Sequence, residues 1–309
     1  RFYLLTDNFP EHYSIPALIP DRRRTEDLYS GGTIPLEVRT MLFFVGQVLP
    51  YIAGAVFLLG VSYRIISWCK VPVPFQLTLF PAPRDGSGRA AAVGTALWLF
   101  KSLYKNDKNL WLWAWLLHVS LAMVIGGHIV GIYFLMNQFT LVGLTSAASQ
   151  AMSATLGTTF GILLMAAIIV LFYRRLADPE VKRLSDPADF IDLLFLLAIV
   201  VTGNHMRLPT VHVDLPAIKA YMGGLLTLSP TPIPENWIFI SHFLLVNVFL
   251  IYFPFSKMLH FAGFLVNRAM LVEAPPVYPT AAGTAIRSSF AGARKPKAPV
   301  GQTGEGVQA

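Results

Sequence analysis

From Asn109 to Tyr173 the chain contains no Asp, Glu, Lys or Arg. One membrane-spanning helix needs about 20 apolar residues, so this stretch has room for two spans and a short polar loop. A soluble helical core of the same size would need charged faces recurring along its helices. Only 13% of the 309 residues are charged, against about a quarter in an average soluble domain. The sequence therefore predicts an all-α integral membrane protein.

Five apolar stretches are candidates for membrane spans. They are residues 41–68, 110–136, 152–173, 187–206 and 236–260. The fourth is the weakest, because only Leu193 to Met206 is free of charge, and so short a segment is alternatively re-entrant or interfacial. Pro254 predicts a kink near the end of the fifth. The expected organisation is an N-terminal arm (1–40), a five-helix membrane domain (41–272) and an extended basic tail (273–309).

Basic residues are unevenly distributed over the connections between these spans. Residues 70–108, 174–186 and the segment after the fifth span are rich in Lys and Arg, whereas 137–151 has neither. The positive-inside rule then places the basic segments and the C-terminal tail in the cytoplasm and the arm outside. Three arginines within 21–27 disagree, although three acidic residues accompany them. We attribute the net charge of +7 to these loops and expect no nucleic-acid binding, because no basic run is interleaved with aromatic residues.

Cysteine usage restricts the possible cofactors. Cys69 is the only cysteine, which excludes disulfides within the chain, iron–sulfur clusters and c-type haem attachment of the C-x-x-C-H kind. Any metal or haem must therefore rely on other ligands.

Four of the seven histidines fall in the second and fifth predicted spans. His118 and His128 are about 15 Å apart along a helix axis, and His242 and His260 about 27 Å apart on one face, since eighteen residues are five turns. The two spans run in opposite directions, so His118 matches His260 in depth and His128 matches His242. Histidines from two facing helices can hold one haem through its iron. The spacing predicts two b-type haems and favours them over packing or proton-relay histidines.

Residues near these histidines are candidate haem contacts. Gly127 and Gly131 leave room for a macrocycle against the second span, although small residues also serve ordinary helix packing. Tyr63, Arg64 and Lys257 lie near the cytoplasmic ends of the first and fifth spans, where haem propionates need hydroxyls or cations. Snorkelling to lipid phosphates is the alternative role for the arginine and the lysine.

Several motifs together resemble the gamma subunit of respiratory nitrate reductase, a membrane cytochrome b that exchanges electrons with quinol. They are LPYIAGAVFLLGVSYR in the first span, H-x9-H in the second, RRLADPEV after the third, and SHFLLVNVFLIYFPFSKMLHF with H-x17-H in the fifth. The resemblance covers about 41–272. It implies that His118 and His260 ligate the haem nearer the cytoplasm, and that His128 and His242 ligate the haem nearer an outer quinol site. It also implies the cytoplasmic membrane of a bacterium or archaeon.

Other segments point to one branch of these cytochromes. The arm, the long 70–108 loop and residues 202–234 look more like the M subunit of the transmembrane complex linked to dissimilatory sulfite reductase, and related cytochromes occur in heterodisulfide-reductase-like menaquinol complexes. This resemblance implies a role in sulfur metabolism, a cytoplasmic iron–sulfur partner of the heterodisulfide-reductase type, and further membrane and outer-side subunits. Nitrate reductase relatives carry a lysine near the quinol before span three, which 137–151 lacks.

A polar cluster follows the fourth span on the expected outer side. His205 closes the span, and Arg207, His212 and Asp214 lie just beyond it. A quinol head group needs a hydrogen-bond partner for each oxygen and a proton acceptor when it is oxidised, which a histidine–carboxylate group supplies. A satisfied interfacial cluster, or a contact with a neighbouring subunit, explains the same residues equally well.

The sequence therefore predicts a dihaem membrane cytochrome b. We expect it to take electrons from menaquinol or ubiquinol outside, pass them through the outer and inner haems, and deliver them to a cytoplasmic iron–sulfur subunit; the reverse direction stays open. Three alternatives remain. They are the gamma subunit of a nitrate reductase proper, a haem-free transporter or proton channel that uses intramembrane histidines, and a structural anchor for a soluble redox complex.

Overall fold

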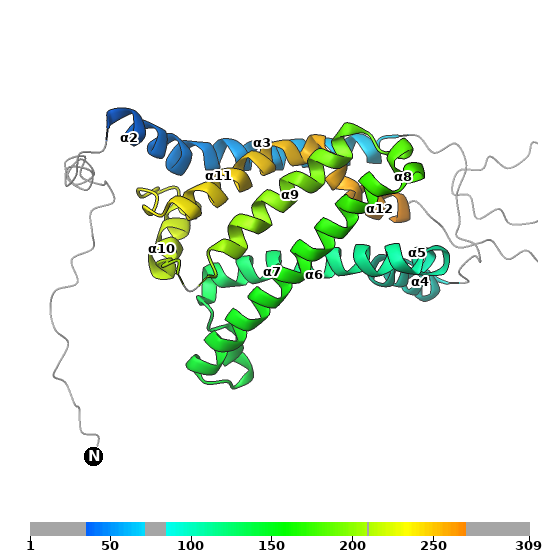
Figure 1. The fold of residues 1–309 in the computed structure, drawn as a ribbon, viewed down its shortest axis with the longest axis horizontal. Helices are drawn as coiled ribbons and strands as arrows, with labels where there is room; N and C mark the ends of the chain where they lie inside the picture. Colours follow the sequence, from blue (N-terminus) through cyan, green and yellow to red (C-terminus); the bar gives the residue numbers. More distant parts are fainter. Residues whose placement is uncertain (1–34, 72–84, 209, 270–309) are drawn as a thin grey trace, which may run out of the picture.

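The computed structural model describes residues 35–71, 85–208 and 210–269, and all regular structure in that part of the chain is helical (Figure 1). Five segments are long and apolar enough to cross a membrane: Leu36–Cys69, Lys108–Gly131, Ser146–Ala177, Pro187–His205 and Trp237–Phe255. The predicted all-α class with five spans is thus confirmed. Residues 1–34 of the predicted arm and the whole predicted tail (273–309) lie outside the described residues.

The first span begins earlier than predicted. It consists of α2 (Leu36–Phe43), a π-helical turn η1 (Phe44–Val48) and α3 (Leu49–Cys69). Residues 36–40 therefore belong to the span, and the expected start at 41 is wrong. In the sequence, the charged residues of this first turn mark the end of the apolar stretch. In the structure they do not interrupt the helix, because its backbone hydrogen bonds continue through them.

The connection 70–108 is not a plain loop. It contains α4 (Gly86–Leu99) and α5 (Lys101–Asn106), and the second span, α6, follows at once (Lys108–Phe134). Asp85 and Asp107 cap α4 and α6, because their carboxylates accept from the backbone N–H groups of Gly88 at 2.6 Å and Leu110 at 2.9 Å.

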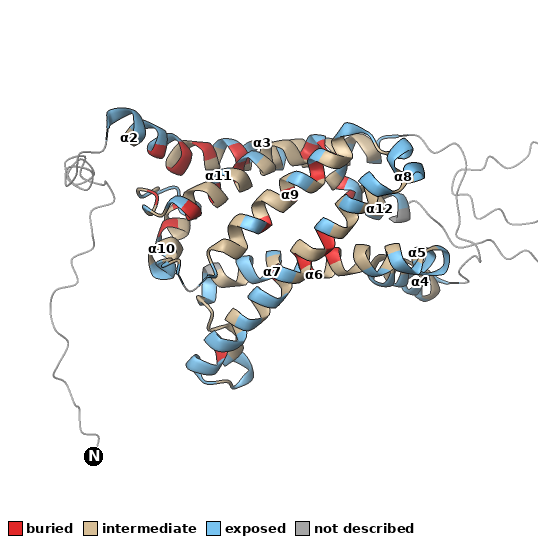
Figure 2. Ribbon diagram, in the orientation of Figure 1, coloured by how far each residue is buried: buried red, intermediate tan, exposed pale blue. Residues whose placement is uncertain are grey.

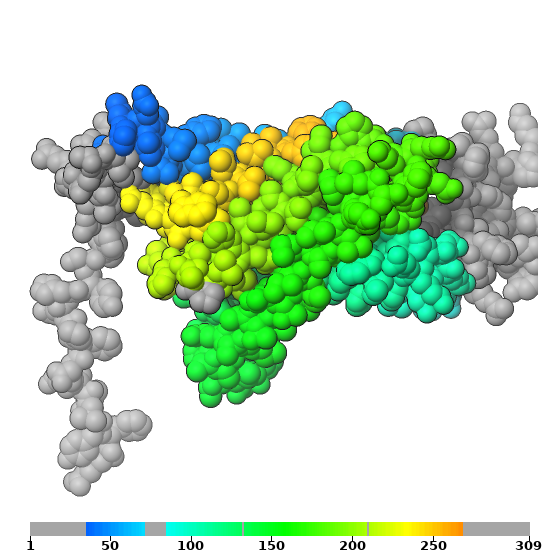
Figure 3. All heavy atoms as spheres, in the orientation of Figure 1, coloured from blue at the N-terminus to red at the C-terminus, as the bar shows by residue number. Residues whose placement is uncertain are grey.

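The third span contains the longest unbroken α-helix among the described residues, with 32 residues. A 3-10 turn, η2 (Gln138–Val142), precedes α7 (Ser146–Ala177), whose first turns project from the body in Figures 1 and 3. After α8 (Pro179–Leu184), the fourth span, α9, runs without a break over Pro187–His205. A continuous helix of 19 residues is long and apolar enough to cross a membrane, which favours a span over the re-entrant alternative. Its charged beginning is explained by a capping box, in which Asp186 and Asp189 each accept the other's backbone N–H.

The fifth span ends in two tight turns. After α10 (Leu215–Leu226), α11 covers Trp237–Tyr252, followed by η3 (Phe253–Phe255), η4 (Lys257–Leu259) and α12 (His260–Ala269). The expectation that His242 and His260 share one face of one continuous helix is therefore wrong. Pro254 lacks the N–H that the helix needs and crowds the preceding turn, so the chain changes direction before His260.

Two apolar clusters hold the helices together. One joins the first span, α10 and α11 around Tyr221, which is 1% exposed and donates to the Gly46 carbonyl at 2.5 Å. The other lies between α6, α7 and α9 around Leu164 and Ile168. Figure 2 shows that buried residues are few. Large apolar side chains are exposed, for example Leu59 at 72%. An apolar surface of this extent is typical of a membrane protein.

Gly60 allows the first span to pack against the break in the fifth. A Cβ built at this glycine would lie 2.7 Å from Pro254 Cβ. We expect Gly60→Ala to destabilise the protein by about 1–3 kcal/mol, the usual range for overpacking. The measurement is a lower thermal unfolding temperature in detergent. Gly54→Ala on the same helix is the matched control, because its Cβ would meet no atom within 4 Å. Equal unfolding of both variants would contradict this packing.

Candidate functional site

The structure brings four histidines together as two pairs, one toward each end of the bundle. Toward the end that carries α8, His118 of α6 and His260 at the start of α12 have their Nε2 atoms 3.5 Å apart. Toward the end that carries α10, the rings of His128 and His242 stack 6.3 Å apart at an interplanar angle of 19°. These are the two pairs that the spacing in the sequence predicted, although they arise from three helices and not from two.

Each of these histidines is oriented through its Nδ1 atom. Nδ1 lies 2.7 Å from Ala114 O in His118, 2.6 Å from Val124 O in His128, 3.1 Å from Ile199 O in His242 and 3.0 Å from Lys257 O in His260. A carbonyl oxygen only accepts, so each of these contacts is a hydrogen bond when Nδ1 carries the proton; His242 Nδ1 also lies 2.9 Å from the Thr202 hydroxyl. Nε2 is then the unprotonated nitrogen. This arrangement is the usual one for a metal-ligating histidine.

The contact between His118 and His260 favours a metal between the rings. With both protons on Nδ1, two Nε2 lone pairs face each other at 3.5 Å. The separation is close to twice a metal–imidazole bond of about 2 Å. Among the described residues no group of three or more His, Cys, Asp or Glu side chains is placed to hold a metal ion. Two axial ligands without others suit a macrocycle that supplies the remaining ones.

Small residues leave open space on α6 beside His128. A Cβ at Gly126, Gly127 or Gly131 of α6 would meet no described atom within 4 Å. The predicted glycine positions therefore fit a flat macrocycle lying against this helix.

The three predicted propionate contacts differ in their surroundings. Tyr63 is 72% exposed. The Arg64 guanidinium lies 5.4 Å from the centre of the Trp68 ring, and its buried Nε has no hydrogen-bond partner. Because Gly60 faces Pro254 one turn earlier and Trp68 faces Gly263 one turn later, Arg64 points at the break before His260. It therefore remains a candidate propionate contact.

Lys257 lies in an ion-pair network instead. Its Nζ contacts Asp186 at 2.5 Å and Asp189 at 3.1 Å, and Arg175 reaches Asp189 at 3.5 Å. The hydrogen bond from Lys257 lowers the pKa of Asp186, and the same bond, with that to Asp189, raises the pKa of Lys257. The stabilisation by this pair is thus lost as pH falls through the lowered carboxyl pKa, or rises through the raised ammonium pKa.

The predicted quinol residues form two separate groups. His205 packs its ring edge against Trp237 at 5.7 Å, and a Cβ at Gly157 of α7 would meet the Arg207 guanidinium. The other group, Val211 to Asp214, lines a shallow pocket of about 420 Å³. His212 accepts there through its backbone carbonyl from Asn236 at 3.0 Å, and Asp214 caps α10 through Ala217 N at 3.0 Å. Asp214 thus has a structural role whatever else it does.

Two contacts to the histidines were not found from the sequence. The Thr202 hydroxyl lies 2.9 Å from His242 Nδ1, and the Phe100 ring meets the His118 ring edge-on at 5.1 Å. Threonine in an apolar span is a weak signal for the first contact. No sequence signal indicated the second, because it depends on the fold of the 70–108 connection.

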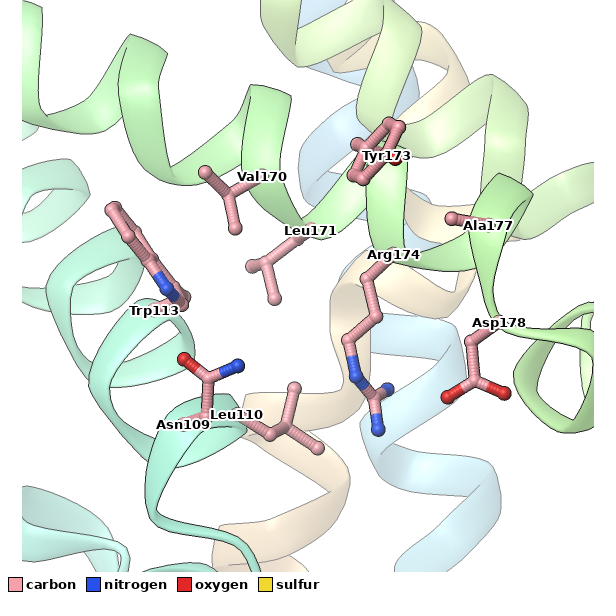
Figure 4. A pocket seen from close by; sticks show the side chains of 9 residues that line it. All are labelled: Asn109, Leu110, Trp113, Val170, Leu171, Tyr173, Arg174, Ala177 and Asp178. Atoms are coloured by element: carbon pink, nitrogen blue, oxygen red, sulfur yellow. The ribbon is translucent and has the colours of Figure 1, made fainter.

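A further pocket opens between α6 and α7 at the α8 end. It measures about 390 Å³, and Figure 4 shows its apolar wall, with Leu110, Trp113 and Leu171, beside the charged groups of Arg174 and Asp178. Arg174 also reaches Asp107, the cap of α6, at 3.4 Å. The residues that line this pocket include neither Phe100 nor any of the four histidines.

Comparison with known proteins gives concordant matches. Residues 101–278 match the family model described as nitrate reductase gamma subunit. The chain is similar to the Hdr-like menaquinol oxidoreductase cytochrome b-like subunits of Archaeoglobus fulgidus (30% identical over 255 residues) and Archaeoglobus profundus (29% over 258), with 71% of this chain and 76% of each relative covered. It is also 32% identical over 88 residues to the nitrate reductase gamma chain of Bacillus subtilis, covering 28% and 40% of the two chains.

Proposed function

This chain belongs to the nitrate reductase gamma subunit family, and we propose from that premise that it is a dihaem cytochrome b subunit of a quinol-linked oxidoreductase complex. Two relatives are named menaquinol oxidoreductase subunits of an Hdr-like type. That naming supports menaquinol as the electron donor and a place in a larger Hdr-like complex. We propose further that the acceptor is a cytoplasmic iron–sulfur protein of the heterodisulfide-reductase type, in anaerobic sulfur metabolism.

The observation that carries the proposal is the pairing of the histidines with a common Nδ1 proton. His118 and His260 would hold one haem, and His128 and His242 the other. The carbonyl contacts at Nδ1 orient the rings, and in the pair His118–His260 the two Nε2 atoms face each other at 3.5 Å, where iron would bind. When bound, the two haems supply one-electron transfer between the ends of the bundle.

The distribution of charge supports an orientation. The α8 end carries Arg174, Arg175, Lys182 and Lys257, so the positive-inside rule favours the cytoplasm for that end. The pair His118–His260 then lies toward the inside and His128–His242 toward the outside. Quinol oxidised at the outer end would release its protons there, while its electrons move inward.

The first test is visible spectroscopy of the protein purified in detergent. A reduced-minus-oxidised spectrum with b-type bands, together with about two haems per chain by pyridine haemochrome, is the expected result. A protein without those bands would favour the haem-free proton channel or the anchor, and the proposal would fail. About one haem per chain would reject the dihaem state alone.

The pocket of Val211 to Asp214 is the proposed quinol contact. Because a general base typically contributes about 10²–10⁴-fold, we expect His212→Gln or Asp214→Asn to lower menaquinol oxidation by at least about tenfold while both haems are retained. Stopped-flow haem reduction by a menaquinol analogue measures this rate. Asp178→Asn, which alters the cap of α8 at the other end, is the control. Wild-type rates in both variants would exclude the pocket.

A further inference from the structure

A phenylalanine in left-handed backbone conformation joins α4 to α5. Phe100 has φ 46° and ψ 45°, a region that bulky side chains rarely adopt. Such a conformation persists only where its surroundings impose it. We call residues 98–108 the elbow segment.

Two tryptophans of α6 hold the elbow segment in place. Trp111 Nε1 donates to the Leu99 carbonyl at 2.8 Å, and Trp115 Nε1 donates to the Trp98 carbonyl at 3.0 Å. Both acceptors belong to the last turn of α4, where carbonyls lack partners within the helix. The bonds thus fix the two residues that precede Phe100 and account for its conformation.

The same face of α6 carries one of the paired histidines. Trp111, Trp115 and His118 are spaced i, i+4 and i+7, so they lie along one side of the helix. Phe100 reaches that side and meets the His118 ring edge-on, with ring centres 5.1 Å apart and planes at 89°. The elbow segment therefore packs against His118 of the histidine pair at the α8 end.

The outer surface of the elbow segment is basic. Lys101, Lys105 and Lys108 are exposed. Asp107, the one acidic residue of the segment, is occupied, because it caps α6 and pairs with Arg174. Three exposed lysines thus belong to the segment whose Phe100 contacts His118.

We propose that the elbow segment is the electron exit of the protein and the docking surface for its redox partner, an iron–sulfur protein with an acidic contact face. The inference rests on the proposed function. Complementary charge steers a partner to the surface and orients it there, and Phe100 joins this surface directly to the His118 ring. Anionic lipid is the competing ligand for interfacial lysines.

The test uses the whole complex, purified from native membranes through a tag on this chain. A zero-length carbodiimide reagent, which joins lysine to carboxylate, is expected to link the elbow segment to the iron–sulfur subunit. In the variant K101E/K105E this link disappears, and electron transfer from the reduced cytochrome to that subunit slows by about tenfold or more. Lys182→Glu, an exposed charge on α8 at the same end, serves as the matched control with wild-type behaviour.

Two results would overturn the docking surface while leaving the proposed function intact. One is unchanged transfer in K101E/K105E with haem content as in the wild type. The other is that K101E/K105E keeps its link to the iron–sulfur subunit but binds more weakly to vesicles that contain anionic phospholipid. That result would assign the lysines to lipid. Absence of b-type bands from the wild type would instead reject the proposed function itself.

A second variant tests the contact beneath the lysines. Phe100→Ala is expected to shift the low-spin electron paramagnetic resonance signal of one haem and to leave the other unchanged, because only one pair touches the elbow segment. Identical spectra for variant and wild type would show that the elbow segment does not reach the haem site.

Discussion

Replacing His242 by alanine is expected to remove one haem and to leave the other, so that haem content falls from about two to about one per chain. A haem held by one axial histidine has lost half of its protein ligation. The His242 ring also packs closely against Gly203 of α9, because a Cβ built at this glycine would lie 3.2 Å from His242 Cε1. The pyridine haemochrome assay gives the content, and a redox titration shows which haem remains.

The other three histidines make this prediction specific. His128→Ala is expected to leave the same haem as His242→Ala, because the two rings form one pair. His118→Ala and His260→Ala are expected to leave the opposite haem. The remaining midpoint potential should therefore fall into two classes, one for each pair of rings, whose centres lie 6.3 Å and 5.8 Å apart.

His205→Ala is the control, because this histidine packs on Trp237 outside either pair. It should retain both haems. If His242→Ala and His128→Ala left haems with different potentials, the pairing would be wrong. If all four single variants kept two haems, ligation by these histidines would be rejected.

The features that could be predicted from the sequence are those that depend on composition along a single helix. Five spans follow from apolar length alone, since the bilayer requires it. The depth of each histidine follows from rise per residue, and that is why the pairs come together even though the helix that was expected to carry His260 ends at Tyr252. The turn that replaces it keeps His260 at the same end of the bundle.

The features that could not be predicted are contacts between segments far apart in the chain. Phe100 reaches His118 only because two indole N–H groups hold a left-handed residue, and propensity argues against that conformation for phenylalanine. Lys257 was interpreted from its position as a propionate contact, yet its ammonium meets carboxylates 68 and 71 residues away in the chain. Charged residues at the start of a span weakened the prediction for α9, although two of them form its cap.

Asp189 belongs to the capping box of α9 and also contacts Lys257, whose carbonyl orients His260. The second large effect that we expect is that of replacing Asp189 by alanine. The carboxylate is 12% exposed and meets Lys257, Arg175 and the Asp186 backbone N–H. Loss of a cap interaction costs about 1 kcal/mol, and the two ion pairs add little to stability because their cations are exposed or half-exposed.

The consequence for the haem site follows from the path of the chain. Lys257 begins η4, and its carbonyl accepts the Nδ1 proton of His260 at 3.0 Å. With Asp189 gone, Lys257 keeps one carboxylate partner, and the turn that orients His260 loses one of its two anchors on α9. Asp189→Ala should therefore lower the thermal unfolding temperature and broaden or shift the signal of the inner haem, with the outer haem unchanged.

Asp189→Asn separates the two roles of the carboxylate, because an amide oxygen can still accept the Asp186 N–H but cannot form the ion pairs. We expect this variant to regain most of the unfolding temperature while the inner haem signal stays perturbed. If both properties recovered together, the ion pairs would have no part in orienting His260. A perturbed outer haem in either variant would show that the effect spreads through the whole bundle, and the local anchor would be rejected.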